Sequence, residues 1–436
     1  MPDNNNQLLS KHADYLLYLL IIFGCIIRFV EVWTHNPIHH LFSDPMRHWE
    51  HARATLWVQP MAVIDPPLYQ IWLSVVQKWT LGLPVLTATY AGMLSVITPW
   101  LWYRFLREAL YSRTLALTGW ALLAWLPSWI GIFDYFMTET LLLPLLGASL
   151  WATLRARRKR TVAAFTQMVV FWLLAGLTRT IAFPLGGLAG FWIWIGYPYK
   201  LRCLGRTILI LVVALGPLAY RNYYYLHMLS PFGSGWLNQI YAESGKSEIK
   251  LHIVRGNVKW HYGFGSPSIN RTLLWPFSNW VPSRTGRVNV LIDVDNGEKD
   301  WRDAYEQSRV EGVERWKLRW ENILLAMVGD SWPDANQDYL SARASMDSRW
   351  LWSPLFLIIV GVGIRRWRET WQRPLLPILI VAWFLVQACS LFVVNEGRYR
   401  KPFEGLLISQ LMVIIDQKRQ RATHLLPTSL EITAAV

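Results

Sequence analysis

The chain has 436 residues, of which 53% are hydrophobic and 17% are charged, and its formal net charge is +14. Long apolar runs recur along most of its length, so the composition predicts a polytopic α-helical membrane protein rather than a soluble one. The positive excess lies in short loops instead of a compact soluble segment. It therefore argues against nucleic-acid binding and for attraction to anionic lipid head groups.

The apolar runs predict about ten transmembrane helices. No small-residue cleavage site follows the first run, which indicates a permanent span rather than a signal peptide. The predicted spans are residues 15–32, 84–103, 115–133, 140–154, 162–178, 181–197, 207–225, 351–364, 375–394 and 405–415.

Basic residues cluster in the short loops between these spans. Because cytoplasmic loops are enriched in lysine and arginine, the clusters fall on one side of the membrane if both termini are cytoplasmic. The sequence therefore predicts a multi-pass protein of the inner (plasma) membrane. The clusters are Arg104, Arg107 and Arg113; Arg155, Arg157, Arg158, Lys159 and Arg160; Lys200, Arg202 and Arg206; Arg365, Arg366, Arg368 and Arg373; and Lys418, Arg419 and Arg421.

Four regions follow from this topology. Residues 1–227 form an N-terminal transmembrane module, whose first outer loop (34–82) is expected to carry the catalytic residues. Residues 228–350 form a small α+β insertion on the outer side, residues 351–417 the C-terminal transmembrane helices, and residues 418–436 a disordered cytoplasmic tail. Within the first loop, residues 68–79 have helical spacing and suit a helix lying in the membrane interface.

Two patterns predict the α+β insertion. Segments 251–264 (LHIVRGNVKWHYGF) and 287–297 (RVNVLIDVDNG) alternate as strands do, and an Asn-Gly turn closes the second. The pattern becomes helical over residues 300–328, with aromatic and apolar residues on one face. These face residues are Trp301, Tyr305, Val313, Trp316 and Trp320.

The first outer loop carries the most conspicuous charges. Asp44 and Arg47 are three residues apart, so on a helical turn one side chain could accept a proton while the other holds a phosphate. An interfacial ion pair is the alternative for these two residues. Asp65 precedes Pro66 and Pro67, and its alternative role is to cap the next helix.

Five histidines crowd the same loop, but their spacing matches neither HExxH nor a Cys/His zinc set. The cysteines fall in spans or at a cytoplasmic end and suggest no metal cluster. The sequence therefore predicts no metal site. The histidines are His35, His39, His40, His48 and His51, and the cysteines are Cys25, Cys203 and Cys389.

Further charges fall on the predicted outer side. Asp134 and Glu139 flank the turn between the third and fourth spans, where low-dielectric surroundings are expected to raise carboxyl pKa values and make better bases. This side carries more arginines than are expected from the positive-inside rule, even when simple snorkelling is allowed for. They are Arg179, Arg221, Arg398 and Arg400, with Tyr399 between the last two.

Six segments together resemble the membrane-embedded glycosyltransferases of the GT-C fold, in the branch with protein O-mannosyltransferases and the lipid A aminoarabinose transferase. The likeness covers most of the chain. Asp65 departs from it, because the aminoarabinose transferase has a lysine before the proline, and the outer insertion also differs. The segments are SDPMRHWEHA, IDPPLYQIWL, TETLLLPLL, GLTRTIAFPL, YRNYYYLHMLSPFGSGWLNQIY and EGRYRKPFEGLLI.

The resemblance implies an inverting transferase that moves a sugar from a polyprenyl-phosphate donor to an acceptor hydroxyl on an envelope lipid, a glycan or an exported protein. No cofactor is expected beyond the lipid-linked donor, and the sequence does not require a metal. Asp44 would be the general base. The phosphate-binding residues would be Arg47, Arg221, Arg398, Tyr399 and Arg400, and the supporting or acceptor-binding residues Asp65, Asp134, Glu139, Arg179, Asn222 and Asn238.

A transporter or flippase of polyprenyl-linked saccharides is the main alternative. Such proteins line a path with charges deep inside several spans and often contain inverted repeats. The predicted spans here are nearly free of charge and no repeat is apparent, which favours the enzyme. A non-catalytic scaffold and a glycosidase with paired carboxylates are further alternatives.

Overall fold

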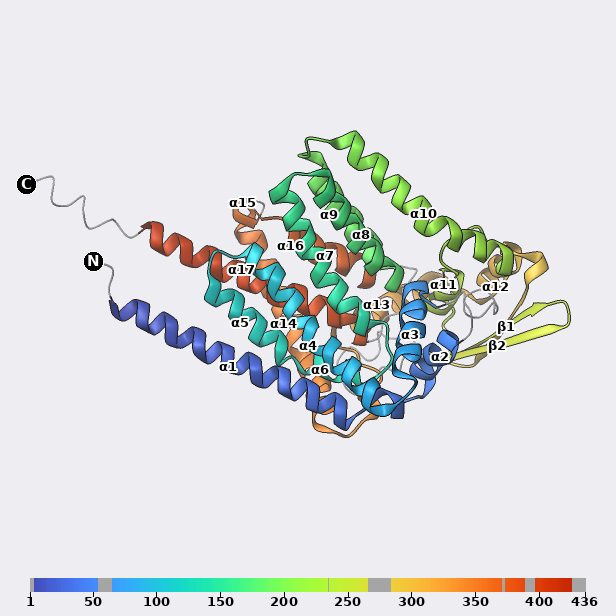
Figure 1. Cartoon of the computed structure of the whole chain (residues 1–436). Helices are drawn as coiled ribbons and strands as arrows, with labels where there is room; N and C mark the ends of the chain where they lie inside the picture. The colour runs from blue at the N-terminus through green and yellow to red at the C-terminus, as the bar shows by residue number, and fades with distance from the viewer. Residues whose placement is uncertain are drawn as a thin grey trace, which may run out of the picture.

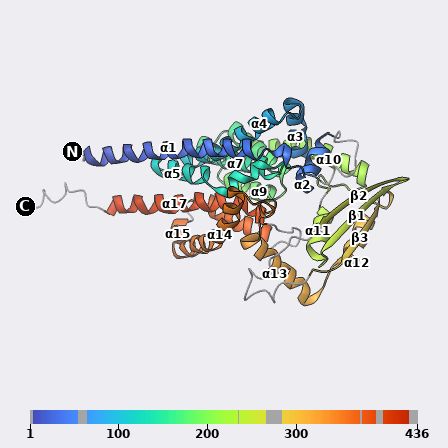
Figure 2. The same cartoon turned by 90° about the horizontal axis from the view of Figure 1, so that it is seen from below.

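The computed structural model describes residues 4–53, 65–233, 235–265, 284–370, 373–388 and 397–425. The chain is mostly helical, with one small sheet. Both termini lie at one end of the helical bundle, which we call the terminal end, and the sheet lies at the opposite end, the sheet end (Figures 1 and 2). This arrangement places the 228–350 insertion and the two termini at opposite ends of the molecule.

Four described helices are long and apolar enough to cross a membrane, or five spans if one bent pair counts as a single span. The four are α1 (Asn4–Thr34), α4 (Pro84–Ala109), α10 (Lys200–Leu226) and α14 (Leu340–Arg365), and the bent pair joins α5 (Arg113–Ala124) to α6 (Pro127–Gly131) and the short helix η3 (Ile132–Asp134). The other bundle helices are α7 (Glu139–Lys159), α8 (Val162–Thr178), α9 (Ala182–Ile195), α16 (Leu375–Trp383) and α17 (Lys401–Leu425).

The structure confirms a helical protein with candidate membrane spans, and each predicted span contains a helix. It does not show ten spans. Helices α8 and α9 are short, and the predicted third span (115–133) is broken by a 60° bend. Pro127 opens α6 and has no backbone N–H to continue the hydrogen bonds of α5.

Two predicted boundaries fall inside helices. Residue 350 lies inside α14, which begins ten residues earlier at Leu340, because the helix continues out of the apolar run into polar sequence. Residues 418–425 belong to α17 instead of a disordered tail, and residues 426–436 lie outside the described residues. Basic residues at the end of α17 are compatible with helix because they interact favourably with its C-terminal dipole.

Arg28 stabilises the break in the third span. Its side chain is fully buried and donates to the carbonyls of Leu123 (2.7 Å) and Ala124 (2.8 Å), which end α5, and of Trp129 (3.0 Å) in α6. It also donates to the backbone and hydroxyl oxygens of Ser95, each at 3.1 Å. A helix end in an apolar core needs such partners, because its last carbonyls have none within the helix.

The insertion is the expected α+β unit. Its sheet has the order β2-β1-β3, with β1 (Glu248–Arg255) antiparallel to β2 (Val258–Gly265) and parallel to β3 (Arg287–Asp293). Ile249, Leu251 and Ile253 of β1 are fully buried in one core with Trp301. Helices α11 (Gly235–Glu243), α12 (Glu298–Ser308) and α13 (Gly312–Val328) complete it.

The strands and the turn at Asn296-Gly297 are confirmed, and Gly297 has the positive φ (59°) that such a turn requires. The helical segment 300–328 is instead two helices, α12 and α13. Gly312, with a φ of 61°, and the extended Glu311 separate them. As a result, Trp316 is 70% exposed instead of sharing a face with the buried Trp301.

In the predicted first outer loop, helices α2 (Ser43–Arg53) and α3 (Pro67–Thr80) pack at the sheet end, and α3 confirms the helix predicted over 68–79. Trp49 of α2 stacks on Phe136, with ring centroids 4.5 Å apart. Tyr69 and Leu73 of α3 are buried in the same cluster. This packing holds α2 beside the segment that connects η3 to α7.

We expect Arg28→Ala to lower the free energy of unfolding by about 3 kcal/mol or more, because several buried carbonyls would lose their donor. Thermal unfolding of the detergent-solubilised protein measures this effect. Arg113→Ala is the matched control, since Arg113 is 59% exposed and its ion pair with Asp14 is long, at 4.0 Å. Equal melting temperatures for the two variants would contradict the role assigned to Arg28.

Candidate functional site

Four polar residues of α2 share one helical face: Asp44, Arg47, His48 and His51, at the spacing i, i+3, i+4 and i+7. The Arg47 guanidinium lies 2.5 Å from Asp44 Oδ1, and its Nε donates to Asp65 Oδ1 at 3.1 Å. His51 Nδ1 lies 2.5 Å from the other oxygen of Asp65. Asp65 is thus a partner of the α2 side chains and does not cap α3, whose N-cap is Pro66.

Arg398 joins this face to α7. It belongs to the short helix η9 (Gly397–Arg400), and its Nη2 donates to Asp44 Oδ2 at 2.9 Å. Its Nε lies 4.0 Å from Oε1 of Glu139, which begins α7 and is fully buried. Arg179, which follows α8, forms an ion pair with the same Glu139 oxygen.

Two aromatic rings flank these arginines. The Tyr399 ring lies 3.7 Å from the Arg179 guanidinium and 5.1 Å from that of Arg398. The Trp332 ring lies 5.0 Å from Arg398. Cation–π contacts of this kind hold a guanidinium in place while leaving its N–H groups to bind anions.

We call the six charged residues of this site the charge cluster: Asp44, Arg47, Asp65, Glu139, Arg179 and Arg398. It contains three carboxylates and three guanidiniums. The side chains of Asp44, Arg47 and Arg179 are 22%, 21% and 16% exposed, whereas the other three are 6% exposed or less. The cluster therefore has a buried interior and an accessible rim, formed by Asp44, Arg47 and Arg179, that a ligand can reach.

The expectation that low-dielectric surroundings raise the pKa of Glu139 is wrong, because Arg179 and Arg398 outweigh the effect of burial and lower that pKa. Two further carboxylates of the charge cluster follow the same pattern. Burial alone would raise the pKa of Asp44, but Arg47 and Arg398 outweigh it and hold that pKa well below its ordinary value. Burial is likewise outweighed at Asp65 by Arg47 and two histidines, so its pKa is also lowered. Both groups are ionised, and Asp44 is a weak base while its two arginines remain bound to it.

The structure assigns Arg221 and Asn222 to a different task. They lie near the end of α10, where Arg221 Nε and Nη2 donate to Asn222 Oδ1 at 3.1 and 3.0 Å. Asn222 donates in turn to the Ser230 carbonyl at 2.7 Å. These contacts order the turn after α10. Among the described residues, no hydrogen bond or ion pair joins Arg221 or Asn222 to the charge cluster.

Three other predicted site residues also lie apart from the charge cluster. Arg400 is buried against Glu404 (3.4 Å) and the Ala326 carbonyl (3.3 Å), because successive residues of a 3₁₀ turn point in different directions. Asn238 is an exposed residue of α11. Asp134 belongs to a second polar cluster, in which the Tyr339 hydroxyl donates to it at 3.4 Å.

His48, His51 and Trp332 belong to the site but were not assigned to it from the sequence. The histidines had a usable signal, because they continue the helical face that begins at Asp44 and Arg47. Trp332 had none, since it lies 66 residues before Arg398 and only the folded chain brings the two together.

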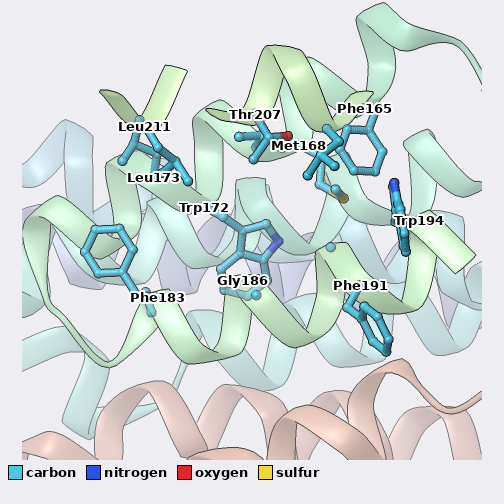
Figure 3. A pocket seen from close by; sticks show the side chains of 15 residues that line it. Phe165, Met168, Trp172, Leu173, Phe183, Gly186, Phe191, Trp194, Thr207 and Leu211 are labelled. Atoms are coloured by element: carbon cyan, nitrogen blue, oxygen red, sulfur yellow. The ribbon is translucent and has the colours of Figure 1, made fainter. Parts of the chain in front are cut away.

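An apolar groove of about 370 Å³ lies between α8, α9 and α10 (Figure 3). Phe183 lies at one end of the groove and Trp194 at the other, with Trp172 and Gly186 between them. The Phe183 end lies beside the backbone of Arg179, because the N–H of the lining residue Ala182 donates to the Arg179 carbonyl at 3.1 Å. The groove therefore begins three residues along the chain from one member of the charge cluster.

No protein-family model matches the chain, and no curated protein matches it either. The resemblance to GT-C glycosyltransferases therefore rests on the six sequence segments and remains a prediction.

His48 makes a pH-dependent contribution that can be measured. Burial lowers its pKa to about 4, against the opposing effect of Asp65. Between pH 6.5 and 4 the unfolded chain binds a proton at His48 and the folded chain does not. The free energy of unfolding therefore falls as the pH decreases through this window, by up to about 3 kcal/mol. The pKa values of Asp44 and Asp65 lie lower, so protonation of these two groups changes the free energy of unfolding at more acidic pH.

We expect His48→Asn to flatten the fall of the melting temperature between pH 6.5 and 4. The exposed neighbour His39 supplies the control, and His39→Asn should keep the wild-type slope. Identical slopes for the wild type and His48→Asn would show that His48 is protonated as readily in the folded as in the unfolded protein.

Proposed function

We propose that this protein is an inverting glycosyltransferase of the inner membrane. It would move a sugar from a polyprenyl-phosphate donor to an acceptor hydroxyl at the outer face. One observation carries the proposal: Arg179 belongs to an arginine-rich charge cluster with an accessible rim, and an apolar groove begins three residues further along the chain. A lipid-linked sugar phosphate has the matching chemistry, an anionic head next to a long apolar chain.

The arginines supply the phosphate site. Guanidinium groups bind phosphate oxygens through paired, charge-assisted hydrogen bonds. Arg47 and Arg179 are partly exposed, and Arg398 lies behind them. Because each arginine is already paired with a carboxylate, a bound phosphate competes with Asp44 and Glu139 for their donors.

This competition gives Asp44 its role. In the substrate-free cluster, Arg47 and Arg398 keep its pKa low. When the donor phosphate takes over these guanidiniums, the pKa of Asp44 rises and the carboxylate becomes a stronger base. Substrate binding itself therefore activates Asp44.

In the proposed reaction, the acceptor hydroxyl gives its proton to Asp44 and its oxygen forms a bond to the anomeric carbon. The bond from that carbon to the phosphate oxygen breaks on the opposite face, so the configuration inverts. Polyprenyl phosphate leaves with the bonding electrons. Arg47, Arg179 and Arg398 stabilise the charge that builds on it, which is commonly the largest contribution to such catalysis.

The groove supplies the site for the polyprenyl chain. Its lining is aromatic and aliphatic, and it extends away from Arg179 along α9. Basic residues at the ends of α7 and α17 are compatible with a cytoplasmic terminal end, which would turn the sheet end outward. The β-strand insertion then lies on the side where an envelope lipid, a glycan or an exported protein would be the acceptor.

The rival function is transport of the same lipid-linked saccharide. Arg28 is a charge inside a predicted span, contrary to a charge-free interior, but its donors are occupied by carbonyls and a hydroxyl. It therefore does not offer a binding group along a transport path. Bond cleavage separates the two functions, since only the transferase releases free polyprenyl phosphate.

Asp44→Asn is expected to slow sugar transfer by about 10²–10⁴-fold, because the amide cannot accept the acceptor's proton. The assay follows the envelope lipids, glycans and glycoproteins of cells lacking this gene by mass spectrometry. The mass that disappears on deletion should return with the wild-type gene and not with Asp44→Asn.

Asp416→Asn is the matched control. Asp416 is also a buried, arginine-paired carboxylate, 3.3 Å from Arg373, but it lies toward the C-terminal end of α17. The gene carrying Asp416→Asn should restore the missing mass. An unchanged envelope after deletion, or wild-type transfer by Asp44→Asn, would refute the proposed function.

Gly187→Leu tests the groove. A Cβ at Gly187 meets open space, so the new side chain would fill part of the groove without displacing the core. We expect the KM for a long-chain donor to rise about tenfold, the effect of roughly two lost methylene contacts. Gly216→Leu in α10, where a Cβ also meets open space, is the control. Equal KM values for both variants would place the lipid chain elsewhere.

A further inference from the structure

A second polar cluster lies at the sheet end of α1, separate from the charge cluster. Glu31 and His35 are one helical turn apart, and Asp134 is the last residue of η3. Each offers one oxygen or nitrogen atom, and these three atoms lie within 4.8 Å of one another. Three ligand-type atoms therefore converge from segments about a hundred residues apart in the sequence.

The distances suit coordination. His35 Nδ1 and Glu31 Oε1 are 3.1 Å apart. Two ligands of a tetrahedral zinc ion, each about 2.05 Å from the metal, are separated by roughly 3.3 Å. Little movement of these side chains would bring both atoms to one ion.

Neighbouring groups hold the three side chains in place. The Tyr339 ring stacks on the His35 imidazole with centroids 3.8 Å apart, and its hydroxyl donates to Asp134 Oδ2. Ser341 donates to Glu31 Oε1. Such outer contacts orient the ligands of metal sites.

The charge balance also points to a cation. Asp134 is fully buried, and its Oδ1 has no hydrogen-bond partner among the described residues. The nearby Lys401 is bound to Asp334 at 3.0 Å and to the Ser128 carbonyl at 2.7 Å. Within the described ranges, no lysine or arginine forms an ion pair with Glu31 or Asp134. A buried carboxylate left in this way is costly, and a bound cation removes the cost.

We propose that Glu31, His35 and Asp134 bind one divalent transition-metal ion of the zinc type. A mixed set of imidazole and carboxylate donors favours Zn²⁺ over Ca²⁺ or Mg²⁺, which prefer oxygen ligands alone. The ion ties the end of α1 to the end of the broken third span. The sequence prediction of no metal considered only histidine and cysteine spacing, and this site uses one histidine with two carboxylates.

The first experiment measures zinc binding directly. The full-length, untagged protein is stripped with a chelator and titrated with Zn²⁺ against a chromophoric competitor. One ion per chain is expected. His35→Ala and Asp134→Asn should weaken binding by about 10–100-fold or more, whereas His39→Ala, at an exposed histidine four residues away, should not change it.

A second variant keeps the test valid if those proteins fold poorly. In His35→Cys, Co²⁺ should produce a thiolate-to-cobalt charge-transfer band that Co²⁺-loaded wild type lacks. Absence of zinc binding by the wild type would overturn the proposal. Equal weakening by His39→Ala and His35→Ala, or no new band in His35→Cys, would also overturn it. These readouts do not involve sugar transfer, so their failure is distinct from failure of the proposed function.

Discussion

The ion pair between Asp44 and Arg398 is the contact that brings the distant parts of the charge cluster together. It joins residues 354 positions apart, at 2.9 Å, and so connects α2 to the segment that begins the last helix. Glu139 and Arg179 extend the connection to α7 and α8. Burying so many charges carries a large desolvation penalty, and replacing them with apolar residues would commonly cost no stability. Their presence is therefore better explained by ligand binding than by folding.

Much of the charge cluster could be predicted from the sequence because its parts obey local rules. Asp44 and Arg47 lie on one helical face, and Glu139, Arg179 and Arg398 all fall at the predicted outer ends of spans. Arg221 and Arg400 satisfy the same rule, yet the structure places them elsewhere. Hydropathy gives the depth of a residue in the bundle but not its angular position around the bundle axis. That position is set by helix packing, which a single sequence does not specify.

The broken third span shows the opposite case. The sequence contains a signal for the break, but averaging hydropathy over a window hides it. Pro127 interrupts the apolar run, and a helix usually ends at or before the residue that precedes a proline. A hydropathy window passes over it because the residues on both sides are apolar. The same averaging hides Arg28 within an otherwise apolar span. Single residues that determine helix ends are therefore lost in any measure that sums over a whole span.

Glycines in α9 explain how a tight bundle can keep an open groove. A Cβ at Gly186 would lie 2.8 Å from Cβ of Trp172, so this glycine permits close packing of α9 on α8. Gly187, the next residue, faces open space in the groove. One helix thus permits close packing at Gly186 and leaves open space at Gly187, because adjacent residues point about 100° apart around the helix axis.

The buried guanidinium of Arg28 has a consequence for how the protein is made. Arg28 lies four residues before the end of the predicted first span, and a charged side chain in a membrane helix is unfavourable until it finds polar partners. Its acceptors at Leu123 and Ala124 are translated 95 and 96 residues later. These partners are therefore absent when the first helix is made, and the Arg28 guanidinium can bind them only after α5 has been made. Biogenesis of this chain is in that respect cooperative between segments rather than sequential.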